Sequence, residues 1–406
     1  MPERTSYPSP VSRGLAARLV ALALGFAVAA VLIVGIQLPL LHPLASTKVN
    51  AVARDLQGPK NPIAWPIVGS AALVVPSLGV ERSWHNSVQP IASLTKLMTA
   101  YVVLRHLPLV AGETGPCVTI TPEDVTAYEE LKATNQSSVA VTSGESLCEI
   151  DLLNGLLVHS ASNYAVLLAD MVAGNVTSFV GLMNQTAVQL GLTGTNYADV
   201  SGFSNESVST ALDQGRLAAT LMKSPLVRDI VDQTSVVLPF AGTVYSFTPD
   251  VGIDNVVGVK SGRTAAAGGC DVMAMTFLDG TTTEVAYAVV LGQRGGNLLG
   301  PAGQAALALE QSATTQVHAT LHRGTVVARI GWGTDTTKVV VARSGRFSWW
   351  AAKGGLRALV HVNSFSSGIR KGQVVGYVSV GVRHPRRLAL IASDSVAPPS
   401  LWQRLR

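Results

Sequence analysis

An uninterrupted apolar run lies close to the start of the chain. Residues 19–41 contain one glutamine and no charged side chain, and Arg13 and Arg18 precede them. A run of this length can cross the hydrocarbon core of a bilayer as a helix, and basic residues before it favour a cytoplasmic N-terminus. We therefore expect residues 1–18 to be a cytoplasmic tail and residues 19–41 a single transmembrane anchor in the cell membrane, with everything that follows outside the cytoplasm.

Two other interpretations of this run remain open. A signal peptide would be cleaved and the protein secreted, although its apolar region is normally shorter and ends in a small-x-small site, which Pro43-Leu44-Ala45 matches poorly. A buried helix of a soluble domain is the other interpretation, although apolar residues around the whole helix argue against it.

A tether and then a domain with both strand and helix patterns follow. Residues 42–64 are polar and contain prolines, which predicts a tether. Beyond them, alternating apolar positions predict strands and 3.6-residue spacing predicts helices. We expect strands at 68–75, 82–88, 255–259, 271–277 and 285–291, and helices at 93–107, across 149–225 and at 302–312. Strands on both sides of a helical insertion predict an α/β catalytic domain with a helical lobe over residues 65–314.

The pattern changes again after residue 314. Short apolar runs recur at a spacing of roughly ten residues and are separated by Gly, Asn, Ser or Pro, which is typical of a small all-β domain. These runs are 325–330, 338–342, 356–362, 374–380 and 388–391. We therefore expect a β-sandwich accessory domain over residues 315–406.

Charge is distributed unevenly between these predicted domains. The whole chain carries a formal net charge of +5, but residues 316–406 hold 14 Lys and Arg against Asp335 and Asp394, which is a net of +12. Next to a membrane anchor, such a domain favours an anionic lipid or an anionic wall polymer as its partner. A solvated surface without a partner is the alternative. Nucleic acid is disfavoured by the expected position outside the cell.

Ser93 and Lys96 combine a hydroxyl and an amine at helical spacing. Residues i and i+3 of a helix share a face, so Lys96 is expected beside Ser93. A serine hydroxyl becomes a good nucleophile when a neighbouring base accepts its proton. The helix N-terminus and a second amine, Lys260, both disfavour an ammonium at Lys96, which would leave it neutral and able to act as that base. Backbone N–H groups at the same helix end suit a developing oxyanion.

Two further segments extend this candidate site. Ser160-Ala161-Ser162 falls between predicted helices, where Ser160 could relay a proton to a leaving amine. Lys260-Ser261-Gly262 ends an apolar strand, whose edge can pair with an extended peptide. Lys260 would supply charge, Ser261 a donor to a carboxylate and Gly262 room for close approach. The backbone N–H of Arg263 is then a second candidate oxyanion donor.

Each segment also has a purely structural interpretation. Ser93 can cap its helix, with Lys96 solvated, and Ser160 or Ser162 can cap the helix that begins near Asn163. Lys260 can be an exposed lysine where a strand meets a turn. Only the combination of the three segments favours serine acyl-transfer chemistry, since this trio is typical of penicillin-binding proteins and class A β-lactamases.

Cysteines and metal-binding patterns add little to this picture. Cys117 and Cys148 border short stretches that can pair as strands, so a disulfide between them is plausible in an oxidising compartment. Cys270 is then a small buried core residue. No His, Cys, Asp or Glu cluster has zinc spacing, and no Gly-x-Ser-x-Gly elbow flanks a serine.

With these residues in view, the chain resembles the serine-type D-alanyl-D-alanine carboxypeptidases, which are the low-molecular-weight penicillin-binding proteins. The similarity covers roughly residues 65–310. The stretches that carry it are Ile91-Ala92-Ser93-Leu94-Thr95-Lys96-Leu97-Met98-Thr99-Ala100, Gly144-Glu145-Ser146-Leu147, Asp151-Leu152-Leu153, Met183-Asn184, Leu190-Gly191-Leu192-Thr193, Ser209-Thr210-Ala211, Gly258-Val259-Lys260-Ser261-Gly262-Arg263-Thr264 and Ala267-Gly268-Gly269-Cys270. The tail, including Ile369-Arg370-Lys371-Gly372, is similar to the accessory domain of many members.

The resemblance implies an activity, its substrate and a set of roles. It implies removal of the terminal D-alanine from peptidoglycan stem pentapeptides without a cofactor, and acylation by β-lactam antibiotics as substrate mimics. Ser93 would form the acyl-enzyme, Lys96 would be the general base and Ser160 would relay the proton. The implied substrate-binding residues are Ser162, Lys260, Ser261, Gly262, Arg263 and Thr264.

The sequence departs from the family pattern at the second and third motifs. The second motif is usually Ser-x-Asn, but Ser162 stands at the Asn position, and a hydroxyl is shorter than a carboxamide and offers fewer donors. Asn163 is adjacent but is expected to point elsewhere. The third motif is usually Lys-Thr-Gly, and Ser261 keeps the hydroxyl. These departures leave two alternatives, namely a catalytically weak peptidoglycan-binding scaffold and a D,D-endopeptidase or β-lactamase that uses the same site.

Overall fold

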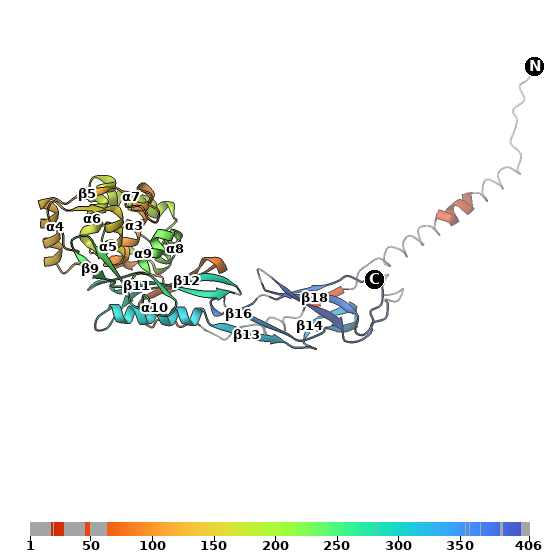
Figure 1. Cartoon of the computed structure of the whole chain (residues 1–406). Coiled ribbons are helices and arrows are strands. Elements are labelled where there is room, and N and C mark those ends of the chain that lie inside the picture. The colour runs from red at the N-terminus through yellow and green to blue at the C-terminus, as the bar shows by residue number, and fades with distance from the viewer. Residues whose placement is uncertain are drawn as a thin grey trace, which may run out of the picture. The chain divides into compact units, whose positions relative to one another are not determined.

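The computed structural model describes residues 18, 20–27, 45–48, 63–279, 281–353, 355–356, 358–365, 367–381 and 385–398. The chain divides into two compact units. One comprises residues 59–316 and 350–354, and the other comprises residues 1–58, 317–349 and 355–406. Both are drawn in Figure 1.

Most of the expected membrane anchor and tether lies outside the described residues. Residues 20–27 of the anchor are described, and they are helical. Within the described ranges, no single helix is both long enough and apolar enough to cross a bilayer. One bent pair of helices, Ser162–Ala173 and Val176–Gln189, has the required length and apolar content when its two helices are taken together. Both of these helices contribute buried residues to the core of the first unit.

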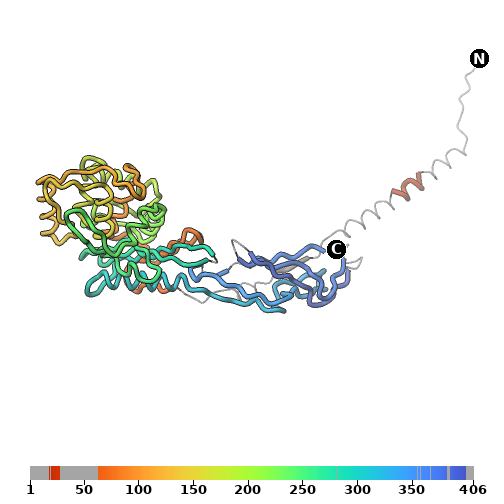
Figure 2. Tube along the Cα trace, viewed as in Figure 1, coloured from red at the N-terminus to blue at the C-terminus, as the bar shows by residue number. Residues whose placement is uncertain are grey.

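A five-stranded antiparallel sheet forms the centre of the first unit. Its strands lie in the order β10-β11-β12-β2-β3, so segments from both ends of the unit are neighbours, as the trace in Figure 2 shows. The strands are β2 (Ser70–Val75), β3 (Val80–Trp84), β10 (Val256–Thr264), β11 (Gly268–Asp279) and β12 (Thr282–Gln293). β2 and β3 are joined by a 3-10 turn at Pro76–Leu78 that ends on Gly79, whose φ of 62° is readily reached by glycine.

Each face of this sheet is covered by a separate hydrophobic core. Helix α10 (Leu299–Ala313) packs against β11 and β12 and buries Ala302, Ala306 and Leu309 in one core. The helical lobe covers the other face and contributes most of the larger core. Figure 1 shows α10 and the lobe on opposite sides of the sheet. The sheet therefore holds β10 at one edge, against the base of the lobe.

The lobe is built from seven further helices and several short strand pairs. The helices are α3 (Thr95–His106), α4 (Pro122–Ala133), α5 (Glu149–Leu157), α7 (Val176–Gln189), α8 (Ala211–Leu221) and α9 (Pro225–Val231), together with α6 (Ser162–Ala173). The short strands are β4 (Gln89–Pro90), β5 (Cys117–Thr119), β6 (Ser146–Cys148), β7 (Val208–Ser209), β8 (Ser235–Leu238) and β9 (Gly242–Tyr245). Helix α3 is buried almost throughout. Helix α4, which the sequence pattern did not indicate, begins with a capping box between Thr121 and Asp124.

β5 and β6 are joined by a disulfide. The two strands are antiparallel, and Cys117 and Cys148 are directly opposite each other. The structure pairs them in a disulfide that closes a segment with a sequence separation of 31. Cys270 is a free, buried cysteine on β11.

Two local expectations were wrong. The strand expected to end at Val259 continues to Thr264, because β10 stays paired with β11 through the whole third motif. Lys260 therefore lies inside the strand, where it is buried, and not at a strand-to-turn junction. Ser93 does not open the main helix but lies in a 3-10 turn, Ala92–Leu94, that leads directly into α3.

The second unit is a β domain with its own core. Its main sheet has the order β1-β14-β15-β19-β18-β17, and β13 and β16 form a second, two-stranded sheet. The strands are β1 (Ala45–Lys48), β13 (Gln316–Leu321), β14 (Val326–Trp332), β15 (Asp335–Val341), β16 (Gly345–Trp350), β17 (Ala358–Val362), β18 (Val374–Val380) and β19 (Arg386–Ala392). The sequence pattern did not indicate β13 or β16. The two units together give the architecture expected from the sequence, an α/β domain with a helical lobe and a C-terminal all-β domain.

Candidate active site

Lys96 lies directly beside the hydroxyl of Ser93. Lys96 Nζ donates to Ser93 Oγ at 3.0 Å and to the backbone carbonyl of Ser201 at 2.9 Å. Lys96 is only 1 % exposed, so its amine has been removed from water and is oriented by these two contacts. The structure thus brings together the first pair of residues that the sequence singled out.

The capping interpretations do not hold for the serines of the first two motifs. The N-cap of α3 is Leu94 and that of α6 is Ala161, and neither helix has a side-chain cap. The hydroxyls of Ser93 and Ser162 are therefore not used to satisfy helix ends. Both residues line one cavity instead.

Burial disfavours the protonated form of the Lys96 amine. Its pKa lies well below the usual value, because desolvation penalises the ammonium and the nearby Lys260 charge acts in the same direction, while Asp199 opposes both. A buried lysine whose ammonium form is disfavoured, and which contacts a serine hydroxyl, can accept the proton of that hydroxyl.

Lys260 is the second buried amine of the site. It is 0 % exposed, and its Nζ donates to the carbonyl of Ser261 at 2.9 Å. Burial lowers the pKa of Lys260 to about 7, against the opposing effect of Asp271. It can therefore be cationic while Lys96 is neutral, which is the division of charge that a base and an anion-binding group require.

Gly262 brings the edge strand against the nucleophile. A Cβ atom at this position would lie 2.5 Å from the backbone nitrogen of Ser93 and 3.1 Å from its Cα. Only glycine allows β10 to approach the start of α3 so closely. The hydroxyl of Ser261 donates to the carbonyl of Phe247 at 2.8 Å, so it would have to exchange this bond to reach a carboxylate.

The second motif lies in the turn between α5 and α6. Ser160 is buried and has a φ of 62°, an uncommon conformation for a residue with a side chain. Ser162 is also buried, and its backbone N–H donates to Ser137 at 2.7 Å. Asn163 points away from the site, because its carboxamide makes two hydrogen bonds to the backbone of Val139. No carboxamide of this motif therefore reaches the cavity, in agreement with the expectation for Asn163.

These segments surround one cavity of about 240 Å³. Seven of the nine residues predicted for the site line it, whereas the buried Lys96 and Lys260 do not, and part of the lining comes from the segment that follows α4. The lining residues are Ser93, Asn135, Gln136, Ser137, Ser160, Ser162, Ser201, Gly202, Phe203, Phe247, Ser261, Gly262, Arg263, Thr264, Ala265 and Leu299. Arg263 is exposed at the rim, and the hydroxyl of Thr264 accepts from the backbone N–H of Ala267.

Sequence reasoning missed Asp199, which organises the loop opposite Lys96. Its Oδ2 accepts from the backbone N–H groups of Gly202 and Phe203 at 2.8 and 2.9 Å and from the hydroxyl of Ser201 at 2.8 Å. Its other oxygen accepts from the hydroxyl of Ser207. This loop presents the Ser201 carbonyl to Lys96. No spacing rule signals such a role, since most of its partners are backbone groups.

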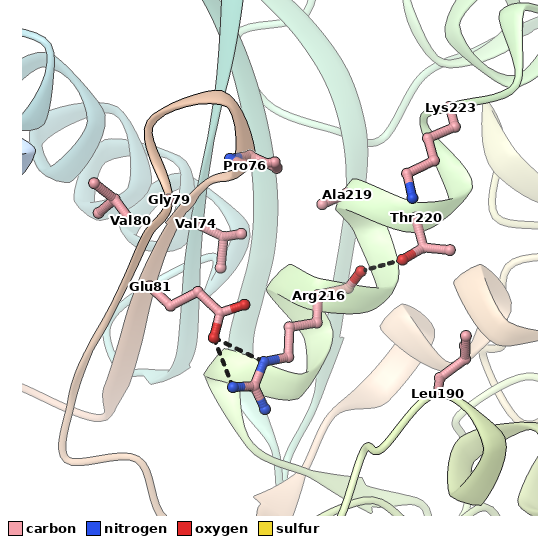
Figure 3. Close-up of a pocket in the computed structure, with 10 residues that line it drawn as sticks. All are labelled: Val74, Pro76, Gly79, Val80, Glu81, Leu190, Arg216, Ala219, Thr220 and Lys223. Carbon is pink, nitrogen blue, oxygen red and sulfur yellow. Dashed lines mark hydrogen bonds and ion pairs between the residues drawn. The ribbon is translucent and has the colours of Figure 1, made fainter. Parts of the chain in front are cut away.

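A larger cavity lies elsewhere on the first unit, between the β2–β3 hairpin and α8. Figure 3 shows its lining, with Arg216 held by Glu81 at 2.6 Å and the hydroxyl of Thr220 turned to the Arg216 backbone. It contains no nucleophile–base pair, and one of its two cationic side chains, Arg216, is already paired with Glu81. The smaller cavity, which Ser93 lines, is therefore the candidate active site. Among the described residues, no group of three or more His, Cys, Asp and Glu could hold a metal.

Comparisons with known proteins agree with this geometry. The family model described as D-alanyl-D-alanine carboxypeptidase, of peptidase family S11, matches residues 81–295. The D-alanyl-D-alanine carboxypeptidase DacC of Escherichia coli is 33 % identical over 146 residues, which are 36 % of this chain and 35 % of that protein. The D-alanyl-D-alanine endopeptidase of the same organism is 29 % identical over 222 residues, 51 % of this chain and 67 % of that protein. The chain thus matches between about a third and two thirds of the length of these relatives.

Solved structures share the fold. Penicillin binding protein 6B from Escherichia coli is 23 % identical, with a TM-score of 0.58 over 83 % of this chain and 96 % of that chain. Penicillin binding protein 5 from Haemophilus influenzae is 21 % identical, with a TM-score of 0.56 over 84 % and 98 %. The predicted fold class is confirmed, and so is the resemblance carried by the three motifs. The chain belongs to peptidase family S11, the D-alanyl-D-alanine carboxypeptidase family.

Proposed function

We propose that this chain is a serine D-alanyl-D-alanine carboxypeptidase that removes the terminal D-alanine of peptidoglycan stem pentapeptides. The observation that carries the proposal is the 3.0 Å contact between the buried amine of Lys96 and the hydroxyl of Ser93. A buried amine in contact with a hydroxyl that lines the cavity, together with a second buried amine on Lys260 next to the lining residue Ser261, suits acyl transfer to a substrate with a free carboxylate.

In the acylation step, Ser93 Oγ attacks the carbonyl carbon of the penultimate D-alanine while its proton passes to Lys96. The backbone N–H groups of Ser93 and Arg263 are the candidate donors to the oxyanion. The C–N bond then breaks, the proton returns to the leaving amine through Ser160, and D-alanine departs. Water attacks the ester by the reverse proton route and releases the shortened peptide.

Recognition of the substrate terminus is assigned to β10. Lys260 would attract the terminal carboxylate and Ser261 would donate a hydrogen bond to it, while the peptide adds along the strand edge. Gly262, Arg263, Thr264 and Ser162 all line the cavity. The same carboxylate pocket would accept β-lactams, which would acylate Ser93.

A D,D-endopeptidase is the second candidate function. It is favoured by the fact that relatives of similar identity are named for both activities. Both reactions use the same acyl-enzyme and differ in whether the leaving amine belongs to free D-alanine or to a cross-linked stem peptide. A scaffold with weak activity is the remaining alternative, suggested by Ser162.

Product analysis separates these functions. Purified protein is incubated with a stem pentapeptide and, separately, with a cross-linked dimer, and released D-alanine and monomer are quantified. The carboxypeptidase proposal expects faster turnover of the pentapeptide, by at least about tenfold. Faster cleavage of the dimer would identify the protein as an endopeptidase. If neither substrate is turned over, the scaffold function remains.

For location, we propose a membrane-anchored protein with the catalytic unit outside the cytoplasm. Fractionation of cells and protease accessibility test this proposal, and a freely secreted form would contradict it.

A further inference from the structure

One face of the main sheet in the second unit carries a row of basic and aromatic side chains. Registers between neighbouring strands place Arg329 opposite Lys338, and Tyr377 opposite His361. Arg387 lies opposite Ser379, two residues along β18 from Tyr377. We call these five residues, Arg329, Lys338, Tyr377, His361 and Arg387, the basic face.

Alternation along the strands shows that all five project from the same side, away from the core. The residues between or beside them, such as Val339, Val378 and Leu388, belong to the hydrophobic core of this unit. Side chains of a strand alternate between its two faces, and directly paired residues share a face. The arginines, Lys338 and His361 are correspondingly exposed.

The aromatic part of the face is ordered. The guanidinium of Arg387 lies 4.5 Å from the ring centre of Tyr377, and the ring of His361 stacks with that of Tyr377 at a centroid distance of 4.9 Å. These three residues cross the neighbouring strands β19, β18 and β17. Stacking leaves the N–H edge of the guanidinium free to bind an oxyanion with two hydrogen bonds.

The charged groups lie at two levels of the sheet. The backbone N–H of Ser393 donates to the backbone carbonyl of Lys338, so these two residues are neighbours on adjacent strands. Ser393 follows Arg387 by six residues in the chain. At the usual rise of a strand, this separates the Arg329–Lys338 pair from Arg387 by about 20 Å. None of these three cations forms an ion pair in the described part of the chain.

We propose that the basic face binds a linear anionic wall polysaccharide that carries phosphate groups. Phosphates would bind at the Arg329–Lys338 pair and at Arg387, and a sugar ring would pack near the row of Tyr377 and His361, since an aromatic ring has a broad apolar surface. Rigid strands hold the cations at a fixed spacing, which suits a polymer with repeated charges. Lipid headgroups in a fluid bilayer have no fixed spacing, so a fixed spacing of the cations would not strengthen binding to them. The inference is independent of the reaction at Ser93.

The test uses the full chain and a fluorescently labelled poly(ribitol phosphate) that carries N-acetylglucosamine. Binding is followed by anisotropy at low and at physiological salt. The face variant is Arg329→Gln/Lys338→Gln/Arg387→Gln. The matched control is Arg323→Gln/Arg343→Gln/Arg370→Gln, which removes three exposed charges of the same unit from outside the basic face. Melting temperature and hydrolysis at the catalytic unit verify that both variants fold.

We expect the face variant to bind at least about tenfold more weakly and with a shallower salt dependence, because fewer counterions are released. The control should lose less than about threefold. Tyr377→Ser keeps every charge and should also weaken binding several-fold. Equal losses in the face variant and the control would overturn the proposal. So would stronger binding to vesicles of phosphatidylglycerol and phosphatidylcholine than to the polymer.

Discussion

Gly262 lies so close to Ser93 that a Cβ atom on the glycine would approach the backbone nitrogen of the serine to 2.5 Å. Two segments more than 150 residues apart in the sequence therefore meet with backbone against backbone. This contact places the edge of β10, where a peptide would add, next to the proposed nucleophile. It also explains why the third motif needs a glycine after its hydroxyl residue.

The first prediction concerns this contact. Gly262→Ala should lower kcat/KM by about 100-fold, because displacing either segment by roughly 1 Å misplaces the reacting atoms. The melting temperature should also fall by a few degrees, because the added Cβ meets backbone and forces one of the two segments to shift. Gly181→Ala is the control, because a Cβ there meets nothing within 4 Å. Wild-type kinetics of Gly262→Ala would show that the contact is not needed.

The second prediction is a pH dependence set by Lys260. Its pKa is lowered to about 7, so it is cationic below that pH and becomes neutral as the pH rises. The free enzyme should then lose affinity for the substrate carboxylate, and kcat/KM should fall on the alkaline side of about pH 7. Lys260→Arg keeps the charge and should move this limb upward by more than one pH unit. An alkaline limb at the same pH in both proteins would exclude Lys260 as its origin.

The third prediction concerns Asp199, a positioning residue that acts through the Ser201 carbonyl. Asp199→Asn should reduce kcat about tenfold, because a carboxamide cannot accept all the N–H donors of the loop. The negative charge of Asp199 raises the pKa of Lys96, so its removal should shift the acid limb of the pH profile to lower pH. Glu206→Gln, on the same loop but exposed, should do neither. A purely structural role would lower stability without moving the acid limb.

The fourth prediction concerns the disulfide between Cys117 and Cys148. It closes the segment that carries Asn135, Gln136 and Ser137, which form one wall of the cavity. Replacing both cysteines by serine should reduce the free energy of unfolding by about 3–4 kcal/mol, as expected for a loop of this length. Reductant should destabilise the wild type by a similar amount and leave the double variant unchanged. Equal sensitivity of both proteins to reductant would contradict this account.

The sequence predicted best what depends on local spacing. The i, i+3 separation placed Lys96 beside Ser93 whether the turn is α or 3-10. The alternation of apolar residues located most strands of both units. These features depend on neighbours in the chain, which the sequence displays directly.

Features that depend on distant partners were not predictable in this way. Lys260 and Ser261 look like the polar end of a strand, yet pairing with β11 carries the strand through Thr264 and buries the lysine. Asp199 accepts mainly from backbone N–H groups, so no residue pattern marks it. Helix α4 has no fully buried residue, and therefore its apolar periodicity is weak.

The most direct test of the central claim is mass spectrometry of the protein after exposure to a β-lactam. The account predicts one covalent adduct on the peptide that contains Ser93. That adduct should be absent in Ser93→Ala, should form at least about 100-fold more slowly in Lys96→Ala, and should form normally in Ser137→Ala, which alters the same cavity. An adduct of equal yield in Ser93→Ala, or at an unchanged rate in Lys96→Ala, would contradict the proposed pairing of nucleophile and base.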